Sequence, residues 1–216
     1  MEELKKVPQE LSKVYEHILS EVIELRNRPR TLLLMQWICL AESPLTVADI
    51  RFSMASDDAY IDERRQSCSD LKDFVGSDER MQRLITSISG GLVETIRHKH
   101  NGFVCVQHID QPVNDGSIVQ FIHQSIKDFL LSGGLKFLAQ YQYTTARMTT
   151  RSHRRQSLAK ATIGYTSCIN YLKLEDVSII YDSSFRYRIR GPSQPFVRYA
   201  TQYWLVHAEE AEQCVR

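Results

Sequence analysis

The 216-residue sequence lacks any run of about 18 consecutive apolar residues, the length that a membrane-spanning helix needs. The N-terminal segment, Met1 to Lys6, is charged and lacks the apolar centre of a secretory signal peptide. No Asn-x-Ser/Thr glycosylation site occurs either. From these absences we expect a cytoplasmic protein that does not contact a membrane.

Cysteine is scarce and scattered. The five cysteines are odd in number and none forms a C-x-x-C pair. We therefore expect neither a disulfide framework nor a zinc site, but buried thiols in a reducing compartment. His98, His100 and His108 flank a predicted turn, but no fourth ligand stands at a useful spacing. They are expected to be solvated loop residues.

The motifs of common catalytic sites are missing as well. The phosphate loop G-x-x-x-x-G-K-[ST] and the dinucleotide pattern G-x-G-x-x-G are both absent, so the chain alone lacks a glycine-rich cradle for phosphates. G-x-S-x-G and H-E-x-x-H do not occur either. His123, Ser125 and Asp128 are triad residue types, but positions 123 and 125 would project about 200° apart around a helix. We expect no enzyme activity and no cofactor in this chain.

Charge of either sign is not in excess. The net charge of +1 gives no global field that would attract nucleic acid. One basic cluster contains no acid. It consists of Arg147, Arg151, His153, Arg154, Arg155 and Lys160. A solvated surface is the main interpretation of this cluster, and contact with protein or RNA is the alternative.

Among the features that are present, helical patterns dominate the first part. Residues 8–25 are predicted to form a helix with Pro8 in its first turn, and Arg28-Pro29-Arg30 should end it. Its apolar residues recur at helical spacing at Leu11, Val14, Tyr15, Ile18, Leu19 and Val22. A second predicted helix has an apolar face made of Leu34, Trp37, Ile38 and Ala41.

A third helix, predicted over 46–55, has the clearest start in the sequence. Thr46 and Asp49 form a variant of the capping box, and Leu45 and Ile50 occupy the positions of a hydrophobic staple. Two helices, a tight connector and a capped third helix resemble a helix-turn-helix core. Further helices are predicted near 62–74 and from Ser77 to the glycines at 90–91.

The pattern then changes from helical to extended. Residues 92–97, 103–106 and 118–122 are rich in β-branched and aromatic residues and are separated by turn residues. Three short strands after a three-helix core are typical of a winged helix. Helix returns at 123–131 and continues through most of 134–216, with a loop predicted over 186–192. The expected fold is therefore mainly α: a winged helix followed by an α-helical bundle or superhelical segment.

Several segments match, in order, patterns of one known family. Residues 7–19 are similar to LPxxLxxxYxxIL, and residues 34–50 to L.W...A..PLT..EL. Residues 89–93 are similar to C.GLL, with Ser89 in place of the cysteine. Val119 to Leu130 is similar to V.F.HqSvkDFL, and residues 196–208 to F..YA..YW..HA. Across nearly its whole length the chain thus resembles fungal NACHT-type signalling proteins, which are STAND (NLR-like) NTPases that often carry ankyrin repeats.

The resemblance implies a linker helix over 1–28 after a NACHT core that is absent here, a winged-helix domain over 29–133, and a helical domain over 134–216 before absent repeats. It implies a non-catalytic regulatory module whose partners are the NACHT core and ankyrin or other repeats in cis, and other proteins. It also implies that His123 contacts a phosphate of ADP in the resting state. ADP or ATP would be bound only in a full-length parent.

Two other functions stay open from the residues alone. A helical protein-interaction scaffold would use the apolar faces of 158–172 and 196–211, and exposed Tyr203 and Trp204 would favour it. A nucleic-acid-binding winged helix would use 46–55 as its recognition helix. That segment offers a single cation, Arg51, which argues against binding to phosphates and base edges.

Overall fold

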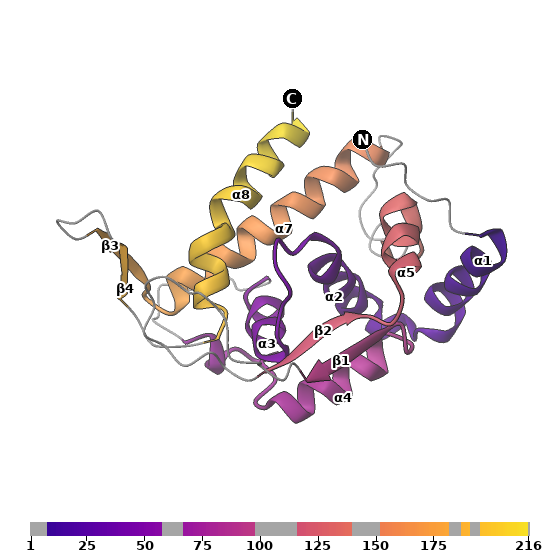
Figure 1. Ribbon diagram of the computed structural model, residues 1–216, viewed down its shortest axis with the longest axis horizontal. Coiled ribbons are helices and arrows are strands. Elements are labelled where there is room, and N and C mark those ends of the chain that lie inside the picture. Colours follow the sequence, from indigo (N-terminus) through magenta and orange to yellow (C-terminus); the bar gives the residue numbers. More distant parts are fainter. Residues whose placement is uncertain are drawn as a thin grey trace.

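The computed structural model describes residues 8–57, 67–97, 116–139, 152–181, 187–190 and 195–215. It is mainly α-helical, as predicted, and the described residues include two antiparallel pairs of strands (Figure 1). The helices are α1 (Gln9–His17), α2 (Arg28–Leu40), α3 (Val47–Ser56), α4 (Asp78–Ile88), α5 (Gln124–Phe129), α6 (Lys136–Ala139), α7 (Ser152–Leu174) and α8 (Val197–Val215). The strands are β1 (Val93–Arg97), β2 (Ser117–Phe121), β3 (Ser178–Tyr181) and β4 (Tyr187–Arg190).

The first predicted helix is confirmed in its position. α1 continues beyond His17 as a π-helical turn, Ile18–Val22, and the chain becomes extended at Ile23. The segment 28–30 was expected to separate two helices, but it begins α2, with Pro29 in the first turn. Proline is favourable there because a first-turn N–H has no helical acceptor to lose.

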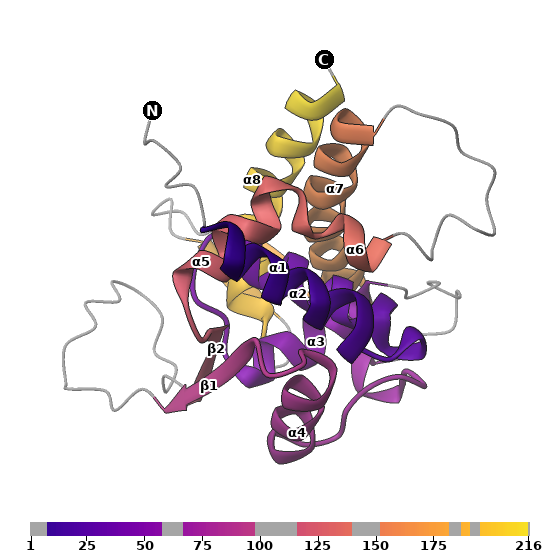
Figure 2. The same ribbon diagram turned by 90° about the vertical axis from the view of Figure 1, so that its right-hand side faces the viewer.

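α2 lies at the centre of the molecule, as Figures 1 and 2 both show. Eight of its thirteen residues are buried, and it contacts α3, α4, α6 and α7. A helix that is buried on most sides belongs to the core rather than to the surface. α2 is therefore the support on which the other elements are assembled.

The start of α3 is confirmed as predicted. The hydroxyl of Thr46 accepts a hydrogen bond from the Asp49 N–H at 3.1 Å, and the Asp49 carboxylate accepts one from the Thr46 N–H at 2.9 Å. These reciprocal bonds satisfy two backbone donors that have no helical acceptor. Leu45 and Ile50, the residues of the predicted staple, are both buried.

α4 begins and ends where the sequence indicates. Ser77 caps it by accepting a hydrogen bond from the Arg80 N–H. Gly90 and Gly91 follow its end with positive φ angles of 60° and 81°. A Cβ at Gly90 would come within 2.8 Å of Ile18, so glycine is also needed for close packing. Of the helix predicted near 62–74, the described part from residue 67 onward forms only a 3₁₀ turn, Cys68–Asp70.

Two of the three predicted wing strands are confirmed. β1 and β2 pair antiparallel with Val93 opposite Phe121. The Val119 N–H donates to the Leu45 carbonyl at 2.9 Å, which places the connector before α3 alongside β2. The third predicted strand, 103–106, lies outside the described residues. The winged helix as a specific fold therefore stays a prediction.

The C-terminal part is a helical hairpin with a β-hairpin at its far end. α7 and α8 lie side by side, and β3 and β4 project beyond them (Figure 1). The loop predicted over 186–192 is wrong for 187–190, which forms β4 opposite β3. The sequence Tyr-Arg-Ile-Arg alternates apolar with charged residues, as half-buried strands do.

An aromatic cluster docks this hairpin on the central helices. Trp37 of α2 lies edge-on to Phe196, Tyr199 and His207, with ring centroids 5.5, 5.8 and 6.2 Å away. All four side chains are buried. Offset and edge-on aromatic contacts add stability beyond the burial of their area. A continuous core therefore joins the segments 29–133 and 134–216, which the resemblance treats as two domains.

Candidate functional site

His123 stands at the end of β2 and the start of α5, where the sequence places it. It is the N-cap residue of α5, with extended backbone at φ −152° and ψ 141°. Its Nδ1 accepts a hydrogen bond from the Ser125 backbone N–H at 3.1 Å. Because Nδ1 is an acceptor, the neutral ring carries its proton on Nε2. Among the described residues that Nε2–H has no partner, so it is available to an anion.

A chain of hydrogen bonds connects His123 to α1. The Ser125 Oγ lies 2.7 Å from His123 Nδ1 and 2.7 Å from the Tyr15 hydroxyl. Tyr15 also packs against Phe129, with ring centroids 5.5 Å apart. Tyr15 and Ser125 are buried, whereas His123 is exposed. Sequence reasoning assigned Tyr15 only to an apolar face, because helical spacing does not reveal a partner 110 residues away.

His123, Ser125 and Asp128 are arranged differently from the sequence expectation. Positions 123 and 125 were expected to point apart, but their side chains are hydrogen-bonded, because His123 is an extended cap and not part of the helix. Asp128 does not orient His123; its carboxylate accepts from the Gln124 amide at 3.1 Å. The His123 nitrogen that an orienting acid would hold is occupied by Ser125. The described side chains therefore do not form a triad.

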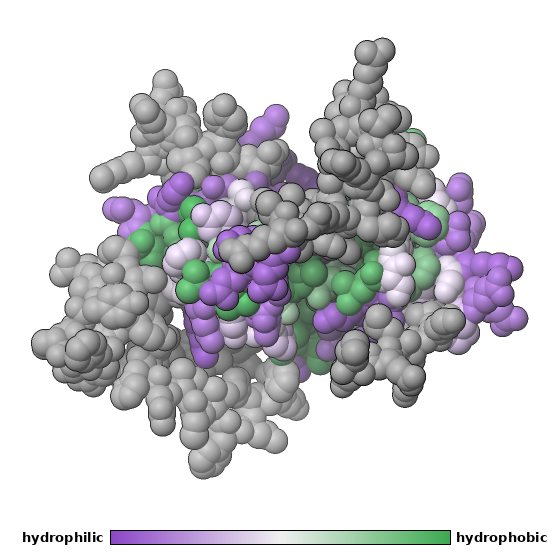
Figure 3. All heavy atoms as spheres, turned by 90° about the horizontal axis from the view of Figure 1, so that it is seen from above, coloured by the Kyte–Doolittle hydropathy of each residue, from purple (hydrophilic) through white to green (hydrophobic). Residues whose placement is uncertain are grey.

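An open cleft of about 860 Å³ lies beside His123, between the connector 41–45, β2 and the start of α5. Lys127, one helical turn after His123, also lines it. The walls include Ile96 and Ile122, which are 42% and 52% exposed. Viewed from above, hydrophobic residues reach the surface in patches in the middle and toward the left of the molecule, among hydrophilic ones (Figure 3).

The donor groups of this cleft suit one anionic group better than a whole nucleotide. The imidazole of His123 and the ammonium of Lys127 both supply N–H donors, and Lys127 has no ion pair within the described residues. The remaining walls combine aliphatic side chains with Ser43, Gln120, Gln124 and one acid, Glu42, and they contain no glycine-rich backbone cradle. His123 and Lys127 are thus the two side chains of this cleft that could donate N–H groups to an anion.

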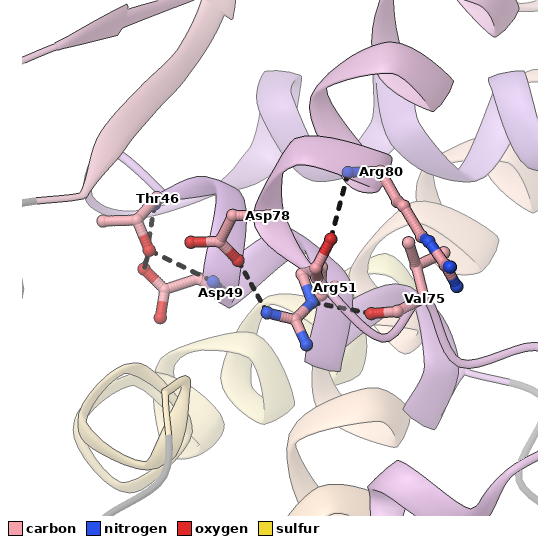
Figure 4. Close-up of polar contacts among 7 residues, drawn as sticks. Thr46, Asp49, Arg51, Val75, Asp78 and Arg80 are labelled. Carbon is pink, nitrogen blue, oxygen red and sulfur yellow. Dashed lines mark hydrogen bonds and ion pairs between the residues drawn. The ribbon is translucent and has the colours of Figure 1, made fainter.

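α3, the recognition helix of the nucleic-acid alternative, is packed inside the molecule. Six of its ten residues are buried, and it contacts α7. Arg51 donates to the Asp78 carboxylate at 2.6 Å and to the Val75 carbonyl at 2.7 Å (Figure 4). Asp49 accepts from the Phe196 N–H at 2.8 Å, where the chain enters α8. The cation that could have met DNA is therefore used inside the fold.

A second histidine, His207 of α8, lies in the aromatic cluster and is 1% exposed. Its Nε2 is 2.9 Å from the Tyr199 hydroxyl, which in turn accepts from the Glu42 N–H. Burial lowers the pKa of His207, and the nearby Glu42 raises it by a smaller amount. Glu210 lies 3.8 Å from Nδ1, too far for a hydrogen bond. The ring is therefore held neutral at physiological pH.

Several predicted candidates lie outside the described residues. These are His98, His100 and His108, and also Arg147 and Arg151 of the basic cluster. Arg154 and Arg155 lie in the first turn of α7, and their side chains are outside the description. Within the described residues, no group of three metal-ligating side chains comes together. None of the described helices combines the length and the apolar character that crossing a membrane requires.

The comparisons with known proteins give no relative. No family model matches the chain, and neither a curated protein nor a solved structure matches it. The function is therefore argued from the residues and their geometry.

Proposed function

We propose that this chain is the non-catalytic regulatory and interaction part of a STAND-type signalling NTPase of the fungal NACHT kind, acting in the cytoplasm. In a longer protein, His123 donates a hydrogen bond to a phosphate of ADP bound to a nucleotide-binding core. That contact holds the core against this module only while ADP is present. A contact that depends on one ligand gives two alternative states of the protein.

The observation that carries the proposal is the different use of the two ring nitrogens of His123. Nδ1 is committed to the cap of α5 and to Ser125, which fixes the ring, while the exposed side chain keeps Nε2–H for an outside acceptor. A donor fixed before binding loses little conformational entropy when the anion arrives. Lys127 adds an ammonium group at the same cleft.

The proposal is tested first on the chain itself. Because the glycine-rich cradle is missing, calorimetry should detect no binding of ADP or ATP tighter than about millimolar. Affinity in the low micromolar range would mean that the chain holds a complete nucleotide site, and the proposed division between core and module would be wrong.

The second test needs the reading frame upstream of this chain. It should encode a phosphate loop, and the joined protein should release fluorescent ADP about tenfold faster when His123 is changed to alanine, a loss of about 1.4 kcal/mol. Gln202→Ala, also exposed but on α8 and outside the cleft, is the matched control and should leave the rate unchanged. An unchanged rate in His123→Ala removes the sensor role.

A protein-interaction scaffold is the second candidate. Tyr203 and Trp204 are half-buried and pack on the core, so the expected exposed aromatic pair is present only in part. Leu205 and Val206, 51% and 36% exposed, do offer an apolar surface on α8. Nucleic-acid binding through α3 is disfavoured by its burial, and a mobility-shift assay should show no shift that weakens steeply with salt.

A further inference from the structure

α1 and the two turns that follow it, Ile18–Val22 and Leu25–Asn27, carry apolar side chains that nothing in the described structure covers. Leu11, Val14 and Val22 are 39%, 50% and 54% exposed, and Leu25 just beyond them is 59% exposed. We call these four residues the α1 stripe. They are four of the ten large hydrophobic residues exposed in the described part of the chain, within a span of fifteen residues. Exposure concentrated in this way marks an interaction surface rather than scattered surface residues.

The stripe is separate from the face that holds α1 to the molecule. Tyr15 and Leu19 are buried toward α5 and the core, and Leu11 and Val14 lie to one side of Tyr15 around α1 at the rotation of about 100° per residue. Val22 lies on the π-helical turn that continues α1, and Leu25 lies on the 3₁₀ turn Leu25–Asn27. α1 lies at the outer edge of the molecule in Figure 1 and faces the viewer in Figure 2. A partner could therefore reach the stripe without displacing α1.

The free border of the stripe is acidic. By the same helical rotation, Glu10 lies about 140° around α1 from Tyr15, and Glu21 immediately precedes Val22 on the π-helical turn. Both are exposed, and neither forms an ion pair with another described residue. Lys13 lies about 60° beyond Glu10 around the helix, farther from the apolar residues, and His17 lies between them.

We propose that the α1 stripe docks an amphipathic helix of a partner protein that carries lysine or arginine beside its own apolar stripe. A helix lying in an apolar groove is a common mode of recognition. The acidic border selects a basic partner by charge complementarity. A second copy of this chain is a worse occupant, because two stripes packed together bring Glu10 and Glu21 of one copy toward the same residues of the other.

The test uses the whole chain and two labelled helical peptides that share one leucine stripe. One peptide carries lysines beside the stripe, and the other carries glutamates. Fluorescence anisotropy should show the lysine peptide binding at least about tenfold tighter. Val14→Ser with Val22→Ser should weaken it about tenfold, and Glu10→Lys with Glu21→Lys should reverse the preference between the peptides.

Leu205→Ser is the matched control, because Leu205 is 51% exposed but lies on α8. It should leave the binding of the lysine peptide unchanged. Circular dichroism first establishes that each variant keeps its helix content. Equal binding of the two peptides, an unchanged preference after charge reversal, or equal loss in Leu205→Ser overturns the proposal. A dimer of the unmodified chain that Val14→Ser dissociates would assign the stripe to a second copy instead.

Discussion

The two ends of the chain are attached to the central helices in different ways. α8 enters the core with Phe196 and Tyr199 packed on Trp37, all buried. α1 is held by Tyr15 and Leu19 and by the hydrogen bond from Tyr15 to Ser125, while its neighbouring apolar face stays exposed. The C-terminal end therefore completes the core, whereas the N-terminal end keeps apolar surface for a further contact.

The largest difference should come from removing apolar groups at each end. Phe196→Ala deletes a ring that is 1% exposed and should lower the free energy of unfolding by about 3–5 kcal/mol in urea. Phe196 has a positive φ of 71°, a backbone angle that is unfavourable for alanine as well as for phenylalanine. The substitution therefore measures mainly the loss of the ring. Val14→Ala, at 50% exposure, should change stability by no more than about 0.5 kcal/mol. Equal losses would break the comparison.

The contact between α7 and α8 should be sensitive to one added methyl group. A Cβ at Gly164 would come within 2.7 Å of the His207 ring. Overpacking costs about 1–3 kcal/mol, which opposes the gain of about 1 kcal/mol in helix propensity from glycine to alanine. Gly164→Ala should thus destabilise the chain in urea, and it should stop doing so in a His207→Ala background. Additive losses in the double variant would show that His207 is not the obstacle.

Acid should weaken the C-terminal attachment. Burial lowers the pKa of His207 in the folded chain. At a pH between the pKa of His207 in the folded chain and that in the unfolded chain, the unfolded chain therefore binds a proton that the folded chain does not. Stability should therefore fall as pH drops below about 6.5, the ordinary pKa of histidine, with a slope of at most about 1.4 kcal/mol per pH unit from this group.

Urea unfolding at several pH values checks this slope against His207→Gln. The charged and titratable groups near the ring, Glu42, Glu210 and Tyr199, remain in that variant. The variant should lose part of the dependence between pH 7.5 and 5. Identical slopes in both proteins would mean that other groups cause the acid sensitivity.

A small effect is expected where α1 is hydrogen-bonded to α5. Tyr15→Phe removes the hydroxyl that bonds Ser125 and should cost about 0.5–1.5 kcal/mol, because Ser125 keeps its contact with His123. Hydrogen exchange should quicken in α1 and not in α8. Tyr165→Phe, on the exposed side of α7, should change neither. Faster exchange throughout the chain would show that α1 is not an independently attached element.

Local structure was largely predictable from the sequence. The capping residue Thr46, the helix start at Ser77, the glycines after α4 and the position of His123 between strand and helix are all confirmed. Each depends on hydrogen bonds or backbone angles between residues a few positions apart. β4 was missed, because four residues leave too short an alternation to outweigh their polar composition.

The sequence by itself determined the mainly helical fold, the starts of α3 and α4, the glycines that end α4, and the absence of glycine-rich phosphate motifs. Only the tertiary structure decided that α3 is covered by α7 and the start of α8, that Arg51 is used internally, and that part of the apolar face of α1 is left exposed. The physical reason is that apolar spacing identifies which residues can be buried, but which element covers them depends on packing between segments far apart in the chain.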